Sequence, residues 1–312
     1  LMFAVSQLFL FIKLLRYRKE EVVIYVNTLL PFGAAIAGKM MGKKVVYHVH
    51  ETSIKPLILK RFLKFVAAKT ASEVVYVSQF LASTETLNGP NSKVVHNALS
   101  KQFVLDADRY QKQAKEKNKM AKVVQQPNGM YLEIDTNDDE MFTVLMLCSL
   151  KDYKGVKEFV NLAKRLPQLR FELVLNVEAK QIGPYFEATK LPMNLFIFPK
   201  QSNVHTFYQK ANLVLNLSHP KQWVETFGMT LLEAMYYGLP VIAPPVGGPT
   251  EIVTHGFNGY AIDQRNEAEM VNAINELANT PLLYKRLSEN AKSTAQKFSV
   301  LAMQEAIVQT VK

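Results

Sequence analysis

Residues 213–253 read LVLNLSHPKQWVETFGMTLLEAMYYGLPVIAPPVGGPTEIV. An apolar strand at 213–218 leads through a polar loop into a helix at 228–237, and a second apolar strand follows at 240–245. The helix has apolar residues at helical spacing, and Gly238 is placed to end it. Short apolar strands joined by a helix predict a parallel sheet covered on both faces. Ligands of such sheets lie beyond the carboxyl ends of the strands, so we expect the loop before the helix to bind one.

The same alternation of strands and helices continues on both sides of this stretch. In the first part of the chain the expected strands are 22–27, 44–50, 73–78 and 93–96, and the expected helices are 31–42, 53–70 and 79–87. In the second part the further strands are 142–150, 171–176 and 195–199, and the further helices are 155–165, 204–211, 249–254, 266–278 and 281–297. The pattern predicts an α/β protein with two Rossmann-like doubly wound domains.

The division into domains follows from where this pattern lapses. Residues 104–140 are polar and charged, with weak strand signals only at 122–124 and 130–134, which indicates a linker or insertion. We therefore expect a partial first domain at 1–103, a second domain at 141–297, and a C-terminal helix at 298–312 that packs back toward the first domain. About half of the first sheet is evident, and the chain opens at Leu1 within an apolar helical pattern, so we expect the first domain to be incomplete.

The apolar opening segment is expected to be a half-buried helix. Its apolar run is interrupted at Gln7 and Lys13, short of the roughly 20 residues that a membrane-spanning helix needs. No charged region precedes it and no small-residue cleavage site follows, so it does not resemble a signal sequence.

The start of the helix at 228–237 has the properties of a phosphate site. The free amides of Gly228, Met229 and Thr230 would point into the crevice, where the helix dipole favours a diphosphate. Gly228 has no side chain, so a phosphate can approach the backbone closely. Gly247 and Gly248, after the second strand, permit another close approach of backbone to ligand.

Two carboxylates flank this helix start in a recognisable arrangement. Glu225 and Glu233 enclose the ETFG turn in a Glu-x7-Glu pattern, and GLP at 238–240 and VGGPTEIV at 246–253 follow in order. The block resembles the retaining glycosyltransferases of family 4, which have the GT-B fold of two Rossmann-like domains facing across a cleft. The resemblance implies that Glu225 holds the donor sugar, that Glu233 holds the nucleotide ribose, and that Phe227 to Thr230 bind the donor through backbone groups.

A basic pair near the first strand of the second domain grips the donor diphosphate in that family. Lys154, followed by Gly155, matches the lysine of this pair, and its charge suits the leaving diphosphate. The second member is usually an arginine, for which this chain has Ser149. Ser149 can donate a hydrogen bond but carries no charge, and Lys151 is the candidate to compensate.

The first domain contributes one candidate catalytic residue. His50 stands at the end of a strand in VYHVHET, where the family carries a histidine that faces the reacting sugar. The alternative is a structural histidine; His48, on the same face of the strand, is second choice. His96-Asn97-Ala98 resembles the family's loop before the linker, and we assign no chemistry to it. With no zinc-type cluster of His and Cys residues, we expect no metal ion and no cofactor besides the nucleotide-sugar substrate.

Charge is distributed unevenly along the chain. The net charge is +10, and residues 1–120 carry +11 while the remainder carries −1. The segment 53–70 combines Lys55, Lys60, Arg61, Lys64 and Lys69 with Leu57, Ile58, Phe62, Phe65 and Val66. It is either a helix of the membrane interface or a surface helix packed on its own sheet. We favour an anionic or lipid-linked acceptor at the inner membrane face; a nucleic acid is not expected, because no nucleic-acid motif accompanies the charge.

These observations predict an enzyme that moves a sugar from a nucleotide-sugar donor, with retention, to a glycan or lipid-linked acceptor in cell-surface polysaccharide synthesis. The alternative is a catalytically weak nucleotide-sugar-binding partner or regulatory module, which Ser149 favours and the intact Glu225, Lys154 and Glu233 oppose. The single cysteine, Cys148, suits a reducing compartment such as the cytoplasm. A third possibility, an anion- or nucleic-acid-binding protein, would require strongly salt-dependent binding to nucleic acid strands.

Overall fold

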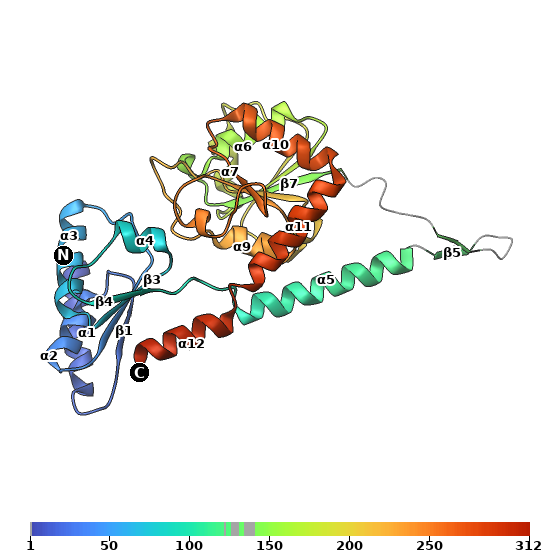
Figure 1. Ribbon diagram of the computed structural model, residues 1–312. Coiled ribbons are helices and arrows are strands. Elements are labelled where there is room, and N and C mark those ends of the chain that lie inside the picture. Colours follow the sequence, from blue (N-terminus) through green and yellow to red (C-terminus); the bar gives the residue numbers. More distant parts are fainter. Residues whose placement is uncertain (1, 122, 126–130, 134–140) are drawn as a thin grey trace.

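The computed structural model describes residues 2–121, 123–125, 131–133 and 141–312. Two α/β units lie side by side, and a long helix and a small hairpin connect them along the chain (Figure 1). The first unit has a parallel sheet in the order β1-β2-β3-β4. Its strands are β1 (Ile24–Asn27), β2 (Val45–Val49), β3 (Glu73–Tyr76) and β4 (Asn91–Val94). The strands agree with the expected ones to within a few residues at each end.

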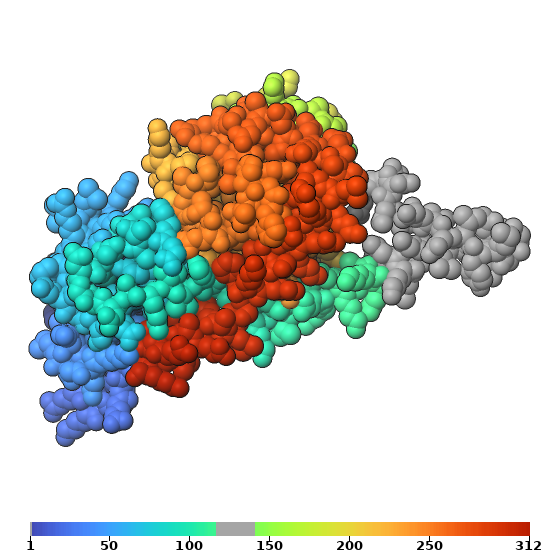
Figure 2. All heavy atoms as spheres, viewed as in Figure 1, coloured from blue at the N-terminus to red at the C-terminus, as the bar shows by residue number. Residues whose placement is uncertain are grey.

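Helices cover both faces of this first sheet. Helix α1 (Met2–Leu14) and the 3₁₀ turn η1 (Leu15–Tyr17) precede β1 in the chain. The helices that connect successive strands are α2 (Phe32–Met40), α3 (Leu57–Thr70) and α4 (Gln79–Thr84). The C-terminal helix α12 (Val300–Val311) packs Met303 and Ile307 against Val46 and Val75, which point to the other face. The space-filling view shows the C-terminal residues lying against the first unit (Figure 2).

The second unit has a six-stranded parallel sheet in the order β12-β11-β10-β7-β8-β9. Its strands are β7 (Thr143–Cys148), β8 (Arg170–Leu175), β9 (Leu195–Phe198), β10 (Leu213–Leu215), β11 (Val241–Ala243) and β12 (Gly259–Ala261). The chain runs outward from β7 to β8 and β9, then returns to β10 on the other side of β7. The loops that leave β7 and β10 therefore diverge, and this switch point is where doubly wound sheets open a crevice for a ligand.

Helices on both faces complete the second unit. They are α6 (Val156–Arg165), α7 (Ile182–Phe186), α8 (His205–Lys210), α9 (Met229–Tyr236), α10 (Glu267–Asn279) and α11 (Pro281–Gln296), with 3₁₀ turns η2 (Asp152–Lys154), η3 (Ala179–Gln181) and η4 (Gly248–Glu251). Alternate strand residues divide between the faces: Val144 and Met146 join one buried cluster, while Leu145 joins another that extends into the first unit. The cluster that contains Leu145 connects the cores of the two units.

Helix α5 (Lys101–Ala121) is the main element that the sequence did not predict. It packs on α8 through a narrow stripe: Phe103 contacts the His205 ring at 4.7 Å, Ala107 is buried, and Tyr110 stacks on the same His205 ring at 5.4 Å. Three residues at helical spacing among many charged ones do not produce a clear amphipathic pattern. Beyond α5 lies the antiparallel pair β5 (Val123–Gln125) and β6 (Tyr131–Glu133), close to the two weak strand signals; the rest of 122–140 lies outside the described residues.

The apolar opening segment forms α1, which packs against α2. The backbone amide of Gly33 donates to Gln7 Oε1 at 3.2 Å, and a Cβ on Gly33 would lie 2.2 Å from the Gln7 carbonyl oxygen, so the two helices touch through their backbones. Gln7 is buried while Phe9 and Ile12 are exposed, so the helix is buried along one side. Within the described residues, no helix is long and apolar enough to cross a membrane.

Candidate functional site

Two adjoining cavities lie at the switch point between β7 and β10. The first has a volume of about 330 Å³ and is lined by the ends of both strands, by Ser149 and Lys154, and by the loop from Glu225 into α9. The second, of about 390 Å³, shares Ser149 and Thr230 with the first and continues past Glu233 toward the end of β9. Because they share walls, the cavities form one groove that is long enough for a ligand of several chemical parts.

The loop before α9 is held in place by the two glycines that follow β11. The amide of Gly248 donates to the Glu225 carbonyl oxygen at 2.9 Å. A Cβ on Gly247 would lie 2.5 Å from that same oxygen, and a Cβ on Gly248 would lie 2.1 Å from the Thr226 oxygen. Both glycines thus permit a close approach of protein backbone to protein backbone. Neither lines the two cavities, so their contact with a donor stays a prediction.

Gly228 has the conformation that the start of α9 requires. It is the N-cap residue of the helix, with φ of 107°, a left-handed conformation that glycine adopts without strain. The next amides, of Met229 and Thr230, belong to the first turn and have no partner within the helix. All three residues line the first cavity, as the sequence predicted for a phosphate site.

Lys154 and Glu225 meet in the first cavity, although 71 residues separate them. Lys154 Nζ donates to Glu225 Oε2 at 2.9 Å, and both side chains are largely buried. The ammonium also lies 5.1 Å from the centre of the Trp223 ring, which stacks on Tyr153 at 5.3 Å. A carboxylate and an aromatic face thus orient the lysine before any ligand arrives.

A glycine brings the Lys154 loop against the β10 loop. Gly155 has φ of 78°, and a Cβ there would lie 2.3 Å from the Leu217 carbonyl oxygen. The Lys-Gly pair therefore serves two purposes: glycine allows the two loops to touch, and the contact directs Lys154 toward Glu225.

Lys151, the candidate to replace the second basic group beside Lys154, does not line either cavity, so this role stays a prediction. Lys151 is exposed, and among the described residues that line the two cavities the lysines are Lys154 and Lys200. Ser149 lines both cavities, at the position where the resemblance implies an arginine. Lys200 and its neighbour Gln201 were not singled out from the sequence; they follow β9, whose position in the sheet decides that they reach the groove.

Glu233 lies in the second cavity on α9. Its Oε2 accepts a hydrogen bond from the hydroxyl of Tyr208, which is fully buried, at 2.6 Å. Burial raises the pKa of Glu233 above its ordinary value, and the Tyr208 hydrogen bond opposes that shift only in part. The Tyr208 hydroxyl binds one carboxylate oxygen, and a carboxylate has further acceptor capacity for a ligand hydroxyl.

We expect Glu233→Gln to make the fold less sensitive to pH and to weaken nucleotide binding. The folded pKa of Glu233 is raised above its unfolded value, near 4.5, so its contribution to stability is present below pH 4.5 and is lost as pH rises through the folded pKa. Denaturant titrations at pH 5 and pH 8 should show that the free energy of unfolding of the variant, relative to that of the wild type, is higher at pH 8 than at pH 5. The nucleotide-induced rise in melting temperature should shrink; an unchanged rise would contradict a ribose contact.

His50 lies in a different cavity, in the first unit. Its Nε2 forms a hydrogen bond with Asn27 Oδ1 at 2.6 Å. The centre of its ring lies 4.2 Å from the centre of the His48 ring. The Nδ1 atom of His48 forms a hydrogen bond with the Tyr25 hydroxyl at 2.8 Å. This cavity, of about 560 Å³, is partly lined by Ile307 of α12. Burial lowers the pKa of His48 to about 4 and lowers that of His50, so both rings are neutral at pH 7. The structure thus joins Glu225 and Lys154 but places His50 apart from them.

The segment that follows β4 also reaches the donor groove. Asn97 lines the first cavity; it belongs to the loop that the resemblance places near the cleft and to which we assign no chemistry. An Asp-x-Asp triplet, a common metal-binding pattern, occurs at 106–108 on α5, outside the groove. There Asp108 accepts a hydrogen bond from the Tyr236 hydroxyl at 2.8 Å, and Asp106 pairs with Arg109 and Gln102.

The geometry agrees with comparisons against known proteins. Residues 132–294 match the family described as glycosyl transferases group 1. The chain belongs to this family. The chain is 30% identical over 171 residues to the poly(glycerol-phosphate) alpha-glucosyltransferase of Bacillus subtilis, which covers 54% of this chain and 25% of the relative. It is 25% identical over 299 residues to the N-acetyl-alpha-D-glucosaminyl L-malate synthase of Bacillus anthracis, covering 89% of this chain and 70% of that one.

The fold is shared with solved glycosyltransferases of this type. HepE of Anabaena, solved with UDP, superposes with a TM-score of 0.77 at 22% identity, covering 96% of this chain and 81% of that one. HepE has also been solved with UDP-glucose, and that structure superposes with a TM-score of 0.74 at 23% identity and similar coverage. The expected GT-B fold is therefore confirmed. The chain spans between 25% and 63% of the length of the first curated relatives that it matches.

Proposed function

We propose that this chain transfers a sugar from a nucleotide-sugar donor, with retention at the sugar carbon. The observation that carries the proposal is the Lys154–Glu225 pair, held at 2.9 Å in the cavity where α9 begins. A cation and free helix amides at one place suit a diphosphate leaving group. The carboxylate beside them suits the hydroxyls of the attached sugar.

The two cavities give the donor a direction. The diphosphate lies between Lys154 and the amides of Met229 and Thr230, and the sugar lies toward Glu225. The ribose binds Glu233 in the second cavity, which extends the base toward Lys200 at the end of β9. We propose a UDP-sugar as the donor, because the HepE structures similar to this chain hold UDP and UDP-glucose.

The reaction exchanges one bond at the sugar carbon for another. The bond from that carbon to the diphosphate oxygen breaks, and its electrons stay on the diphosphate, where Lys154 and the α9 amides stabilise the charge. The acceptor hydroxyl attacks from the same face, and its proton passes to the leaving phosphate oxygen. We propose that no metal ion takes part, which a transfer assay in excess EDTA tests. Retention is supported by the names of two relatives, which specify alpha products.

We propose an anionic glycan or lipid-linked acceptor, as in cell-surface polysaccharide synthesis. The first unit carries most of the positive charge, and the relative from Bacillus subtilis is named for poly(glycerol-phosphate), a polyanion. His50 and Asn27 offer neutral hydrogen-bonding groups in the cavity of this unit. An attractive field would concentrate such an acceptor near the groove.

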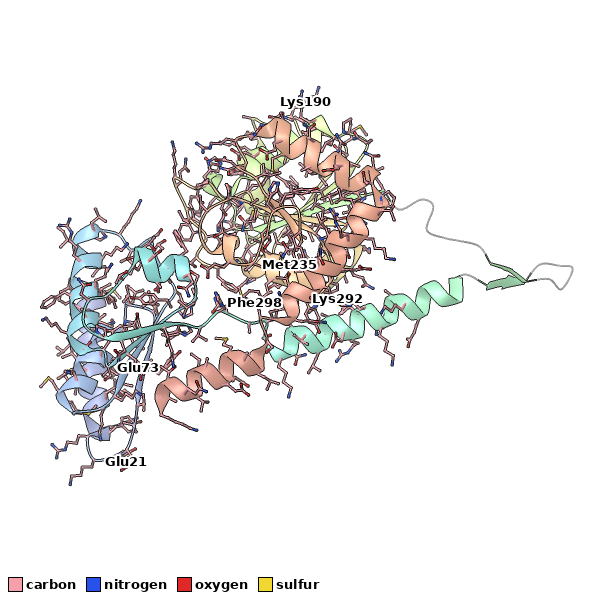
Figure 3. The ribbon with its side chains drawn as sticks, in the orientation of Figure 1. Glu21, Glu73, Lys190, Met235, Lys292 and Phe298 are labelled. Atoms are coloured by element: carbon pink, nitrogen blue, oxygen red, sulfur yellow. The ribbon has the colours of Figure 1, made fainter. Side chains whose placement is uncertain are left out.

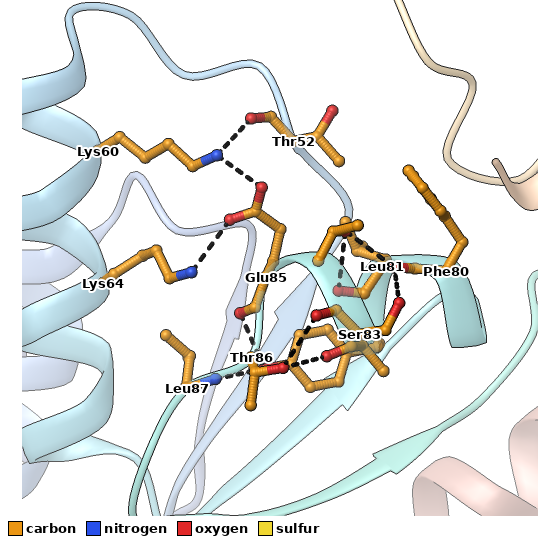
Figure 4. A network of polar contacts seen from close by, with 12 residues as sticks. Thr52, Lys60, Lys64, Phe80, Leu81, Ser83, Glu85, Thr86 and Leu87 are labelled. Atoms are coloured by element: carbon orange, nitrogen blue, oxygen red, sulfur yellow. Dashed lines mark hydrogen bonds and ion pairs between the residues drawn. The ribbon is translucent and has the colours of Figure 1, made fainter. Parts of the chain in front are cut away.

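Helix α3 supports a further part of this proposal, that the chain works at the inner membrane face. Two of its lysines are used internally: Lys60 and Lys64 both donate to Glu85, at 2.6 and 3.2 Å (Figure 4). The outward side keeps exposed apolar and basic residues, namely Lys55, Leu57, Ile58, Arg61, Phe62, Phe65 and Lys69. A helix with this mixed outward side can lie in the interface of an anionic bilayer.

Vesicle flotation tests the membrane contact. The chain should float with vesicles that contain phosphatidylglycerol and should not float with pure phosphatidylcholine. Ile58→Asp should weaken binding by about tenfold or more, since burial of one aliphatic side chain is worth about 1.5–3 kcal/mol. Met193→Asp is the matched control, because Met193 is 99% exposed on the second unit. Equal loss in both variants would contradict a role for α3.

Measurements of nucleotide binding and of turnover together test the proposal that the chain uses a nucleotide-sugar donor. Trp223 is the single tryptophan and touches Lys154, so its fluorescence should change when a nucleotide binds. UDP-, GDP- and ADP-sugars are titrated, and each binder is then assayed for hydrolysis and transfer in the full-length protein. Binding without turnover across donors and acceptors would favour the nucleotide-sugar-binding module instead, which the uncharged Ser149 supports.

A further inference from the structure

A single carboxylate of the second unit holds three groups outside that unit. Glu251, at the end of η4, accepts the backbone amide of Gln79 at Oε2 and that of Phe80 at Oε1, both at 2.9 Å. Its Oε2 also pairs with His96 Nε2 at 2.8 Å. Gln79 and Phe80 begin α4 of the first unit, and His96 lies in the segment that follows β4. One side chain therefore binds both the start of α4 and the segment through which the chain leaves the first sheet.

The contact is strong for its size. The Glu251 side chain is 16% exposed, so these hydrogen bonds form largely away from water. Hydrogen bonds to an ionised carboxylate are roughly twice as strong as neutral ones. Two parallel bonds to successive amides also fix the orientation of α4 relative to η4. The two units therefore meet through a specific, directional contact as well as through apolar packing.

The same contact connects directly to the donor loop. Glu251 follows Gly248, whose amide holds the Glu225 carbonyl oxygen. On the other side, the His96 ring lies 6.0 Å from Phe227 of that loop and 5.5 Å from Phe298, which Figure 3 shows between the two units. The residue after His96 is Asn97, which lines the donor cavity. A shift of the first unit at Glu251 would therefore also move the residues that contact or line the donor cavity.

We propose that Glu251 is a positioning residue for sugar transfer. It sets the first unit, which is proposed to bring the acceptor, at a fixed place against the loop that holds the donor. The inference rests on the proposed function, because it assumes that donor and acceptor approach each other across the two units. Glu251 touches neither cavity and therefore acts through Gln79, Phe80 and His96.

The test uses Glu251→Gln in the full chain, because glutamine keeps the size of the side chain. Its amide group has one acceptor oxygen and would turn an NH₂ toward a backbone N–H, so the paired contact is lost. Glu73→Gln is the matched control: Glu73 pairs with Lys44 at 2.8 Å within the first unit, at the end of the sheet away from the linker (Figure 3).

Five readouts are compared with the wild type. Glu251→Gln should lower kcat for UDP-glucose turnover by about tenfold or more, a loss typical of misplaced reacting groups. The UDP affinity from Trp223 fluorescence, and the donor KM, should change less than about twofold, since nearly all of the donor cavity belongs to the second unit. Small-angle scattering should show a larger radius of gyration, and amide exchange at Gln79 and Phe80 should accelerate. Glu73→Gln should leave all five unchanged.

Two outcomes overturn the proposal. An unchanged kcat with unchanged scattering and exchange would show that Glu251 does not position the units. A parallel fall in UDP affinity, melting temperature and kcat would show a merely structural role. If the wild type neither binds UDP nor turns over UDP-glucose, the proposed function fails for this donor. The scattering and exchange measurements then still decide on Glu251, and normal values in the variant would reject it.

Discussion

Replacing Lys154 with methionine is expected to lower kcat for transfer by about 10²–10³-fold, the cost typical of removing one group that stabilises charge in the transition state. Methionine keeps the length and apolar stem of the side chain, so its contact with Trp223 is retained in part. What is lost is the charge that faces the leaving diphosphate. Because Ser149 carries no charge, Lys154 is the lysine of the first cavity, and its loss leaves the helix amides alone.

Steady-state kinetics and UDP titration check this prediction. The UDP dissociation constant should rise, because Lys154 contacts the diphosphate in the bound state as well. Lys157→Met is the matched control, since Lys157 lies two residues after Gly155, is 65% exposed and pairs with Asp152. Lys200→Met separates the two cavities: it should weaken UDP binding with little effect on kcat. A Lys154→Met enzyme with normal kcat would mean that another group supports the leaving phosphate.

The order of strands and helices could be predicted from the sequence because buried parallel strands are short and apolar. All residues of β2 are buried, and Tyr47 and Val46 serve opposite faces of the sheet. The helix over the site could be predicted as well, since Gly228 and Gly238 both adopt the left-handed conformation at its ends. These features depend on near neighbours in the chain, and a single sequence contains them.

Other features depend on contacts between distant segments, which a single sequence does not show. Gly247 and Gly248 approach the backbone of residues 225–226, a contact that the sequence did not predict. Asn97 reaches the donor cavity because the segment after β4 runs toward the second unit. Strand β12 (Gly259–Ala261) could not be predicted because three residues, one of them a glycine, carry too little apolar pattern to be detected.

The candidate site follows the same division. Glu225 and Lys154 could be paired from the sequence only through a resemblance, and the structure supplies the physical reason, a glycine contact between two loops at the switch point. His50 shows the limit of the approach. It lies at the end of β2 as expected, but the cavity that it lines is formed with α12 and is separate from the donor groove. A contact of His50 with the reacting sugar therefore stays a prediction.

Glu225→Gln is expected to lower the transfer rate without weakening UDP binding, whereas Lys154→Met is expected to lower both. The glutamine still accepts hydrogen bonds from a sugar, but it no longer neutralises Lys154, whose ammonium is then free to bind the diphosphate more tightly. UDP affinity should hold or increase. The transfer rate should fall by about 10²–10³-fold, as for other removals of a charged group from a transition state.

The two variants and their combination decide whether the pair acts as one unit. If Lys154 and Glu225 act together, the double variant should lose little more kcat than either single variant, because each single change already breaks the unit. If they act independently, the losses should multiply. A Glu225→Gln protein that loses UDP affinity and keeps its kcat would contradict the assignment, since Glu225 would then hold the nucleotide and not the reacting sugar. The pair at 2.9 Å would in that case be a structural contact that closes the loop.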